Sequence, residues 1–257
     1  MQSIILYDRE AIIFWSTKIA ATTLAEIILS LQEPAYISNS NKEKDIWPKF
    51  SKEIWRPRYR RKAGEDYSRY KKLLFCRNPY HRLISNYLDK YVCSSSPTPE
   101  KVPDVANFEQ FVDCLYATQL KEENMPTIDH YEFCLQTSGD GWDLLQENSE
   151  NLFVFTTPPT GLPEARVPMA KESIHLTYYL LGWTPPHVPE WKYSTKAWPK
   201  VVNSAYTFSV AQLDALHKNP RSITYTSFYP EHVRKKVYKL YEKDFLYFGS
   251  LGYRFKV

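Results

Sequence analysis

The chain has 257 residues, of which 43% are hydrophobic and 24% are charged, and its formal net charge is +4. This composition excludes a predominantly disordered protein, and the length suits one sizeable α/β domain over residues 1–257. The small net charge does not indicate nucleic-acid binding. The four cysteines form no CxxC pair and have no histidine at zinc spacing, so we expect no metal site and no disulfide framework.

We expect neither a signal peptide nor a membrane span in the N-terminal sequence. Four charged residues interrupt its apolar character: Asp8, Arg9, Glu10 and Lys18. A membrane span needs about 18 consecutive apolar residues, and a signal peptide needs a basic start before an apolar run. We therefore expect a cytoplasmic protein without an integral membrane segment.

The first predicted elements are a buried strand at Ala11–Trp15 and an amphipathic helix. The helix has apolar residues at i, i+3, i+4 and i+7: Leu24, Ile27, Ile28 and Leu31. The loop between them offers Lys18, Thr22 and Thr23 beside the free N–H groups of a helix N-terminus, an arrangement that binds phosphate. It lacks the Gly-Lys-Ser/Thr ending of a Walker A loop, which disfavours a nucleoside triphosphatase. The alternative is a coincidental polar loop.

Basic side chains are concentrated before and within the next predicted strand. They are Arg56, Arg58, Arg60, Arg61, Lys62, Arg69, Lys71 and Lys72. Such a stretch can attract a polyanion. The alternative is a solvated loop whose charge is balanced by Glu65 and Asp66.

A second strand and helix follow in the same order. Lys72–Cys76 predicts a strand, and Asn78 and Pro79 predict a helix start, with asparagine as the N-cap. The helix has apolar residues on one face: Tyr80, Leu83, Ile84, Tyr87, Leu88 and Tyr91. A polar stripe on the opposite face consists of Asn78, Arg82, Ser85 and Asp89.

The end of this strand and the polar stripe predict a second anion site. The stripe directs Ser85 away from the core, and Arg77 at the strand end can reach the same space. An arginine and a hydroxyl together suit a phosphate dianion. The alternative is that Arg77 pairs with a structural carboxylate.

The rest of the chain predicts three more helices and one more strand. Asn107 with Gln110 resembles a capping box that opens a helix through about Leu120, and Leu152–Phe155 favours a buried strand. Ser209 with Gln212 opens a short helix. The last helix is expected to begin at Pro230, to end at Gly249 and to carry one apolar face: Val233, Val237, Tyr241 and Phe248.

Together the two strand–loop–helix segments resemble the 5′-phosphosulfate and 3′-phosphate motifs of sulfotransferases, especially the membrane-type carbohydrate sulfotransferases. The resemblance covers residues 12–31 and 72–91, with Tyr87 two residues beyond the motif serine, and extends to Val237–Tyr253. Thr17 and Ala21 stand where the family has proline and glycine. If position 21 requires a positive φ, Ala21 is strained by about 1 kcal/mol.

The resemblance implies a P-loop-like sulfotransferase fold, an α/β domain with a mostly parallel central sheet flanked by helices. It implies 3′-phosphoadenosine 5′-phosphosulfate (PAPS) as the cofactor and no metal. Arg77 and Ser85 would bind the 3′-phosphate. The residues implied for the 5′ side are Lys18, Ala20, Ala21, Thr22 and Thr23. Lys18 would also stabilise charge on the leaving oxygen during in-line transfer.

A segment around His130 is similar to the His-Trp segment of some carbohydrate sulfotransferases, with Tyr131 in place of tryptophan. His130 is therefore a candidate general base for an acceptor hydroxyl. The alternative is a structural or adenosine-side histidine. Glu132, His175 and His81 are the rival bases.

The acceptor is expected to be a carbohydrate or a small metabolite with a hydroxyl or amine. Trp183, Trp191 and Trp198 would suit a stacking wall, although such residues also form cores. Two other functions stay open. One is a non-catalytic module that binds nucleotide, or sulfated polysaccharide on the basic stretch. The other is a kinase-like phosphotransferase, which needs Mg²⁺ and carboxylates that form no clear motif here.

Overall fold

The computed structural model describes residues 1–16, 18–19, 21–31, 50, 59–92, 105–121, 135–147, 149–156, 171–182, 201–202, 204–218 and 222–256. They belong to two compact units. The first comprises Met1–Cys76, Ser138–Pro158 and Val167–Tyr193, and the second comprises Arg77–Thr137, Pro159–Arg166 and Ser194–Val257. The expected single domain over residues 1–257 stays a prediction.

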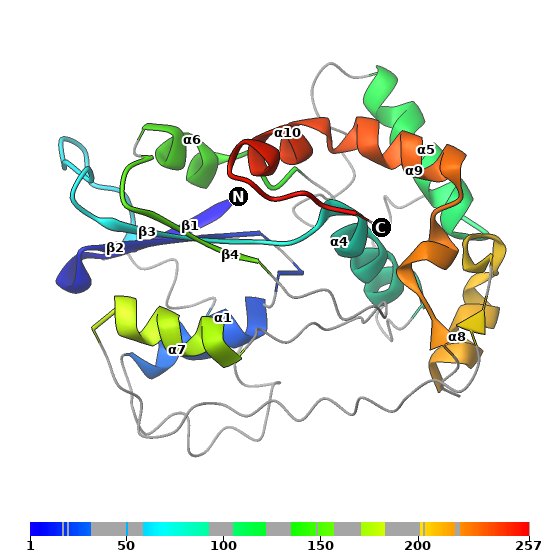
Figure 1. Ribbon diagram of the computed structural model, residues 1–257, viewed down its shortest axis with the longest axis horizontal. Helices are drawn as coiled ribbons and strands as arrows, with labels where there is room; N and C mark the ends of the chain where they lie inside the picture. Colours follow the sequence, from blue (N-terminus) through cyan, green and yellow to red (C-terminus); the bar gives the residue numbers. More distant parts are fainter. Residues whose placement is uncertain are drawn as a thin grey trace. The chain divides into compact units, whose positions relative to one another are not determined.

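A four-stranded sheet organises the first unit. Its strands, in spatial order, are β1 (Gln2–Leu6), β2 (Ala11–Trp15), β3 (Lys71–Cys76) and β4 (Leu152–Thr156). A short 3₁₀ turn, η1 (Tyr7–Arg9), links β1 to β2, which run antiparallel, whereas β2, β3 and β4 are parallel (Figure 1). The mostly parallel sheet and the positions of three of its strands confirm the sequence analysis. Strand β4 was expected to be buried, but only Phe155 is buried and Phe153 is 38% exposed. Strand β1 is an additional edge strand that the analysis did not predict.

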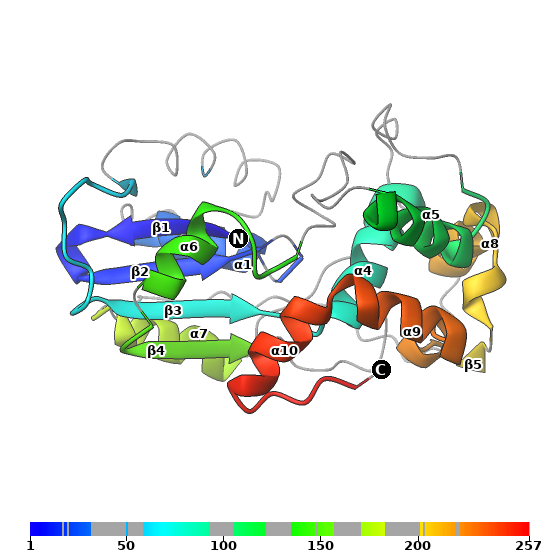
Figure 2. The ribbon, with the colours of Figure 1, turned by 90° about the horizontal axis from the view of Figure 1, so that it is seen from above.

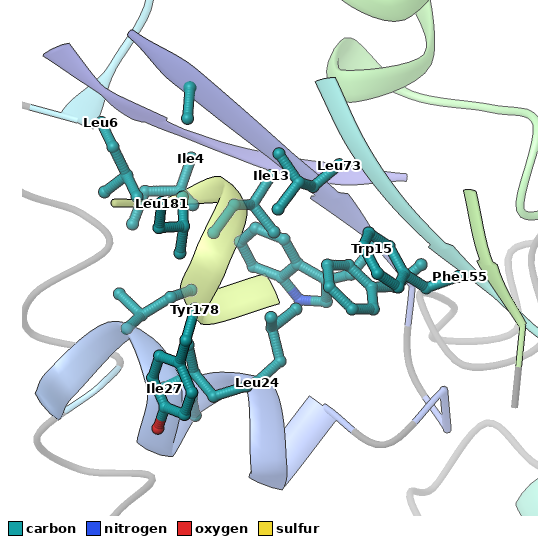
Figure 3. Close-up of a cluster of buried hydrophobic side chains, with 14 of the residues drawn as sticks. Ile4, Leu6, Ile13, Trp15, Leu24, Ile27, Leu73, Phe155, Tyr178 and Leu181 are labelled. Carbon is teal, nitrogen blue, oxygen red and sulfur yellow. The ribbon is translucent and has the colours of Figure 1, made fainter. Parts of the chain in front are cut away.

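Helices cover both faces of this sheet. Helices α1 (Ala21–Ser30) and α7 (Lys171–Leu180) pack on one face, and α6 (Asp140–Glu147) packs against β1 and β2 (Figure 1). The core under α1 and α7 consists of alternate strand residues, such as Ile13 and Leu73, with helix residues such as Leu24 and Tyr178 (Figure 3). Because both faces are covered, every residue of β2 is buried. This explains its uninterrupted apolar sequence.

One glycine allows α6 to lie close to the sheet. A Cβ atom at Gly141 would stand 2.9 Å from the backbone oxygen of Gln2, which is closer than real Cβ contacts. Glycine therefore permits an approach of helix to strand that any larger residue would prevent.

The second unit is mainly helical. It contains α4 (Pro79–Tyr87), a π-helical turn η3 (Leu88–Val92), α5 (Phe108–Lys121), α8 (Val210–Lys218), α9 (Glu231–Leu240) and α10 (Glu242–Ser250). Two 3₁₀ turns, η4 (Ala205–Thr207) and η5 (Tyr225–Phe228), and a parallel pair of short strands, β5 (Val201–Val202) and β6 (Ser222–Ile223), complete it. Helix α9 lies against α5 (Figure 2). The core between these elements is rich in aromatic rings, including Tyr87, Phe108 and Phe228.

The predicted helix starts are confirmed by their caps. Asn78 Oδ1 accepts the Tyr80 N–H at 3.0 Å. Asn107 Oδ1 accepts the Gln110 N–H at 3.0 Å, and Ser209 and Gln212 exchange reciprocal bonds of 3.2 and 2.8 Å. These side chains satisfy N–H groups that a helix leaves unpaired at its start.

The expectation of one C-terminal helix was wrong. The helix begins at Glu231 with Pro230 as its N-cap, breaks at Tyr241, where φ is −112° and ψ is 24°, and continues to Ser250. The predicted apolar face is nevertheless buried on both sides of the break. A single non-helical residue keeps the 3.6-residue periodicity in phase, so the sequence pattern does not reveal it.

Candidate functional site

The first candidate anion-binding segment is the loop between β2 and α1 in the first unit. It leaves the carboxyl end of a central parallel strand and enters the N-terminus of a ten-residue helix, the position at which α/β proteins bind ligands. Ile19 anchors the loop in the core, and the Lys18 side chain is half-buried. Thr23 is buried. Ala20 and the side chains of Ala21 and Thr22 lie outside the described residues.

Backbone strain in this loop lies at Lys18 rather than at position 21. Lys18 has φ of +59°, in the left-handed region, whereas Ala21 opens α1 and is not among the residues with positive φ. The conditional strain expected at Ala21 is therefore absent. A non-glycine residue in the left-handed region costs roughly 1–2 kcal/mol. The loop thus stores strain at the residue that carries its positive charge.

The loop also contains a buried polar group with no partner in the described chain. Ser16 follows β2 directly and is buried, and its Oγ has no hydrogen-bond partner among the described residues. Leaving a buried hydroxyl unpaired costs about 1–3 kcal/mol, and a bound ligand atom is one group that would remove this cost.

The second candidate segment begins at Arg77, the residue that follows β3. Arg77 is only 2% exposed. Its Nη2 donates to Tyr225 Oη at 2.8 Å. Its backbone N–H donates to Gln136 Oε1 at 2.9 Å, and its carbonyl accepts from Gln136 Nε2 at 2.8 Å. The side chain and backbone of Arg77 are therefore held separately, by Tyr225 and Gln136.

His81 contacts the same tyrosine. Its ring stacks on that of Tyr225, with centroids 3.7 Å apart and planes 10° from parallel. Burial, together with the positive charge of Arg77, lowers the pKa of His81 to about 4. His81 is thus neutral near pH 7 and too weakly basic to compete well as a general base.

Helix α4 is buried on all sides, which corrects the view of its polar stripe. Every residue from Pro79 to Tyr87 is buried, and Ser85 is 0% exposed. The apolar residues lie in the aromatic core, whereas Arg82 and Ser85 are outside that cluster but still shielded from water. Ser85 was expected to point away from the core; it is instead fully buried, as are Arg82 and other polar groups of the second unit.

Among these polar groups is Asp244 of α10, a fully buried carboxylate. It accepts the Gln136 N–H at 2.9 Å, the Thr137 N–H at 2.8 Å and the Thr137 hydroxyl at 2.7 Å. Burial raises the pKa of Asp244, while these hydrogen bonds and the positive charge of Arg82 oppose that rise. Sequence reasoning placed Asp244 in the resembling C-terminal segment but gave neither it nor Gln136 a role.

Several predicted site residues belong to neither of the two candidate segments as the structure describes them. His130, Tyr131, Glu132 and the three tryptophans of the proposed stacking wall lie outside the described residues. His175 is exposed on α7 in the first unit. The identity of the general base therefore stays a prediction.

Four side chains of the basic stretch are engaged within the first unit. Arg61 pairs with Glu147 at 2.5 Å, and Lys62 lies over the Tyr7 ring at 3.9 Å. Lys71 and Lys72 donate to the carbonyls of Leu180 and Ser68, each at 2.8 Å. These contacts favour a structural role for the described part of the stretch over polyanion binding.

The described ranges also bear on metal binding and on membrane association. No cluster of three or more His, Cys, Asp or Glu side chains suited to a metal ion occurs there. None of the helices found there combines the length and apolar character that crossing a membrane requires.

Comparison with known proteins identifies the family. A family model described as "Sulfotransferase family" matches residues 5–150, more than half of the chain. This segment contains the loop after β2 and the whole of α4 with Arg77. No curated protein and no solved structure shows a significant match. By the extent of the family match, the chain belongs to the sulfotransferase family.

Proposed function

We propose that this protein transfers a sulfuryl group from PAPS to a hydroxyl or amine of a carbohydrate or small-metabolite acceptor. One observation carries the proposal. Within the matched segment, two neighbouring parallel strands, β2 and β3, are each followed in the chain by one of the two candidate anion-binding segments. A donor with phosphate groups at both its 5′ and 3′ positions requires two such segments.

The donor set fits this cofactor. Lys18, Thr23 and the N-terminus of α1 supply positive charge and hydrogen-bond donors for the 5′ side. The Ser16 hydroxyl, which has no partner among the described residues, adds another polar group there. Arg77 and Ser85 supply a charged and a neutral donor for the 3′-phosphate. Both are buried, and a charge-assisted hydrogen bond is stronger away from water.

The roles of the residues follow from the chemistry. PAPS, when bound, supplies the activated sulfuryl group. Lys18 and the α1 N–H groups stabilise negative charge as it develops on the leaving oxygen, since donors fixed before the reaction act most strongly on transition-state charge. His130 accepts the proton of the attacking acceptor group. Arg77 and Ser85 hold the nucleotide and take no part in bond breaking.

A labelled-donor assay tests the proposal. The protein is incubated with [³⁵S]PAPS and a pooled library of carbohydrates and small metabolites in the presence of EDTA, and label in the acceptor pool is measured. We expect transfer without added metal. Nucleotide binding without transfer to any pool would favour a non-catalytic module, and labelling only from [γ-³²P]ATP with Mg²⁺ would favour a phosphotransferase. The cytoplasmic location stays a prediction from the sequence.

A further inference from the structure

The backbone of Arg77 is paired with one side-chain amide. The Gln136 side chain accepts the Arg77 N–H at 2.9 Å and donates to the Arg77 carbonyl at 2.8 Å. This pairing uses both polar groups of one peptide residue, as an antiparallel strand neighbour does. Strand β3 ends at Cys76, so the amide continues the fixed backbone by one residue. Gln136 is 1% exposed and is shielded from competing water.

Gln136 is in turn fixed by Asp244. The Asp244 carboxylate accepts the Gln136 N–H through one oxygen and two groups of Thr137 through the other. A buried carboxylate is costly unless it is hydrogen-bonded or paired with charge, and these three donors together with the charge of Arg82 meet that condition. The network runs from Asp244 through Gln136 to Arg77, and all three residues belong to the second unit.

We propose that Gln136 is a positioning residue for binding of the 3′-phosphate, held in place by Asp244. This inference rests on the proposed function, in which Arg77 binds that phosphate. A guanidinium presents its donors in a rigid planar fork, so its contact with phosphate depends on the direction in which the side chain leaves the backbone. Gln136 fixes that starting direction before ligand binds, and the ordering cost of the arginine is then not incurred on binding.

The test compares variants at two neighbouring residues, of which Gln136 bonds Arg77 through its side chain and Thr137 bonds Asp244. Gln136→Met removes both bonds to Arg77 and keeps the side-chain length. Thr137→Val removes one hydroxyl bond to Asp244 and leaves the Arg77 contacts in place, so it is the matched control. Calorimetry gives the dissociation constants of adenosine 3′,5′-bisphosphate and of adenosine 5′-phosphate, and their ratio isolates the 3′-phosphate contribution.

We expect Gln136→Met to reduce this affinity ratio by about 3–10-fold, because the Arg77 side chain must then be ordered on binding. The affinity for adenosine 5′-phosphate should not change. Thr137→Val should retain the wild-type ratio. A purely structural role predicts that both variants weaken both nucleotides alike, and that result would overturn the inference. A wild-type ratio in Gln136→Met would also overturn it.

Two further measurements keep the outcomes separate. Should Gln136→Met fail to fold, Asp244→Asn tests the inference instead. The NH₂ group of the new asparagine cannot accept the Gln136 N–H, while its carbonyl oxygen can still accept from Thr137. The expected effect is a smaller reduction in the same ratio, and an unchanged ratio would count against the inference. A wild-type protein that binds the two nucleotides equally would instead contradict the proposed function itself.

Discussion

Replacing Lys18 separates the charge of the first anion-binding loop from its backbone strain. Lys18 lies in the left-handed region with φ of +59° and carries the positive charge of the described part of the loop. Lys18→Ala removes the ammonium and keeps the strained Cβ. Lys18→Gly removes the ammonium and also relieves the strain, because glycine adopts positive φ without steric cost. Lys18→Arg keeps the charge on a longer, planar group.

The expected magnitudes differ for turnover and stability. Both Lys18→Ala and Lys18→Gly should lower the transfer rate by roughly 10²–10³-fold, the usual effect of losing one group that stabilises developing negative charge. That loss corresponds to about 3–4 kcal/mol in the activation free energy. The glycine variant should exceed the alanine variant by about 1 kcal/mol in free energy of unfolding, the cost of a Cβ at this φ. Lys18→Arg should recover part of the rate.

Single-turnover transfer with saturating PAPS gives the rates, and urea denaturation gives the free energies of unfolding. Lys18→Ala should lower the transfer rate more than it weakens nucleotide binding, since the contact strengthens as charge develops. A glycine variant that transfers at the wild-type rate, beside a slow alanine variant, would show that loop geometry rather than charge governs the rate. Wild-type transfer in both variants would remove Lys18 from the mechanism.

The other predictions concern the second segment and the general base. Arg77→Ala should raise the dissociation constant of adenosine 3′,5′-bisphosphate roughly tenfold or more and barely change that of adenosine 5′-phosphosulfate, and Ser85→Ala should have a smaller effect. Calorimetry showing equal losses of affinity for both ligands would contradict the assignment of Arg77 to the 3′-phosphate. His130→Ala should lower turnover by about 10²–10⁴-fold at nearly constant cofactor affinity in steady-state and binding assays, whereas turnover within a few-fold of wild type would make His130 structural. The pKa of His81 falls from 6.5 to about 4 on folding, so the unfolded chain binds more protons than the folded chain between these pH values. The stability that His81 contributes is therefore fully present above about pH 6.5 and is lost as the pH falls toward 4. His81→Phe keeps the ring stack but cannot titrate. Between pH 7.5 and pH 5, chemical denaturation should show that wild type loses about 2 kcal/mol more free energy of unfolding than this variant, and equal losses would contradict the lowered pKa of His81.

The sequence predicted the elements whose signals are local. The strand Ala11–Trp15 and the N-cap at Asn78 are confirmed because burial on both faces and an unpaired helix N–H leave marks within a few residues. Strand β1 was missed because it is an antiparallel edge strand with the polar start Gln2–Ser3. The break at Tyr241 was missed because the apolar face continues across it.

The environment of Arg77 was beyond sequence reasoning for a different reason. Its partners Gln136 and Tyr225 lie 59 and 148 positions away along the chain, and no periodic pattern connects such residues. Amphipathic analysis also treats a polar residue as one that faces water. Ser85 is fully buried, so its position depends on packing by other helices, which the stripe on α4 does not encode.

Some of the residues that hold Arg77 lie beyond the segment that the family model matches. The match ends at residue 150, yet Tyr225 binds the guanidinium and Asp244 holds the residue that pairs with the Arg77 backbone. A chain ending at residue 150 would leave the buried N–H groups of Gln136 and Thr137 without their acceptor. Each such loss costs about 1–3 kcal/mol, comparable with the contribution of a charged contact to a phosphate. The C-terminal helix α10 is therefore part of the second candidate segment in energetic terms, although it donates no group that we assign to the cofactor.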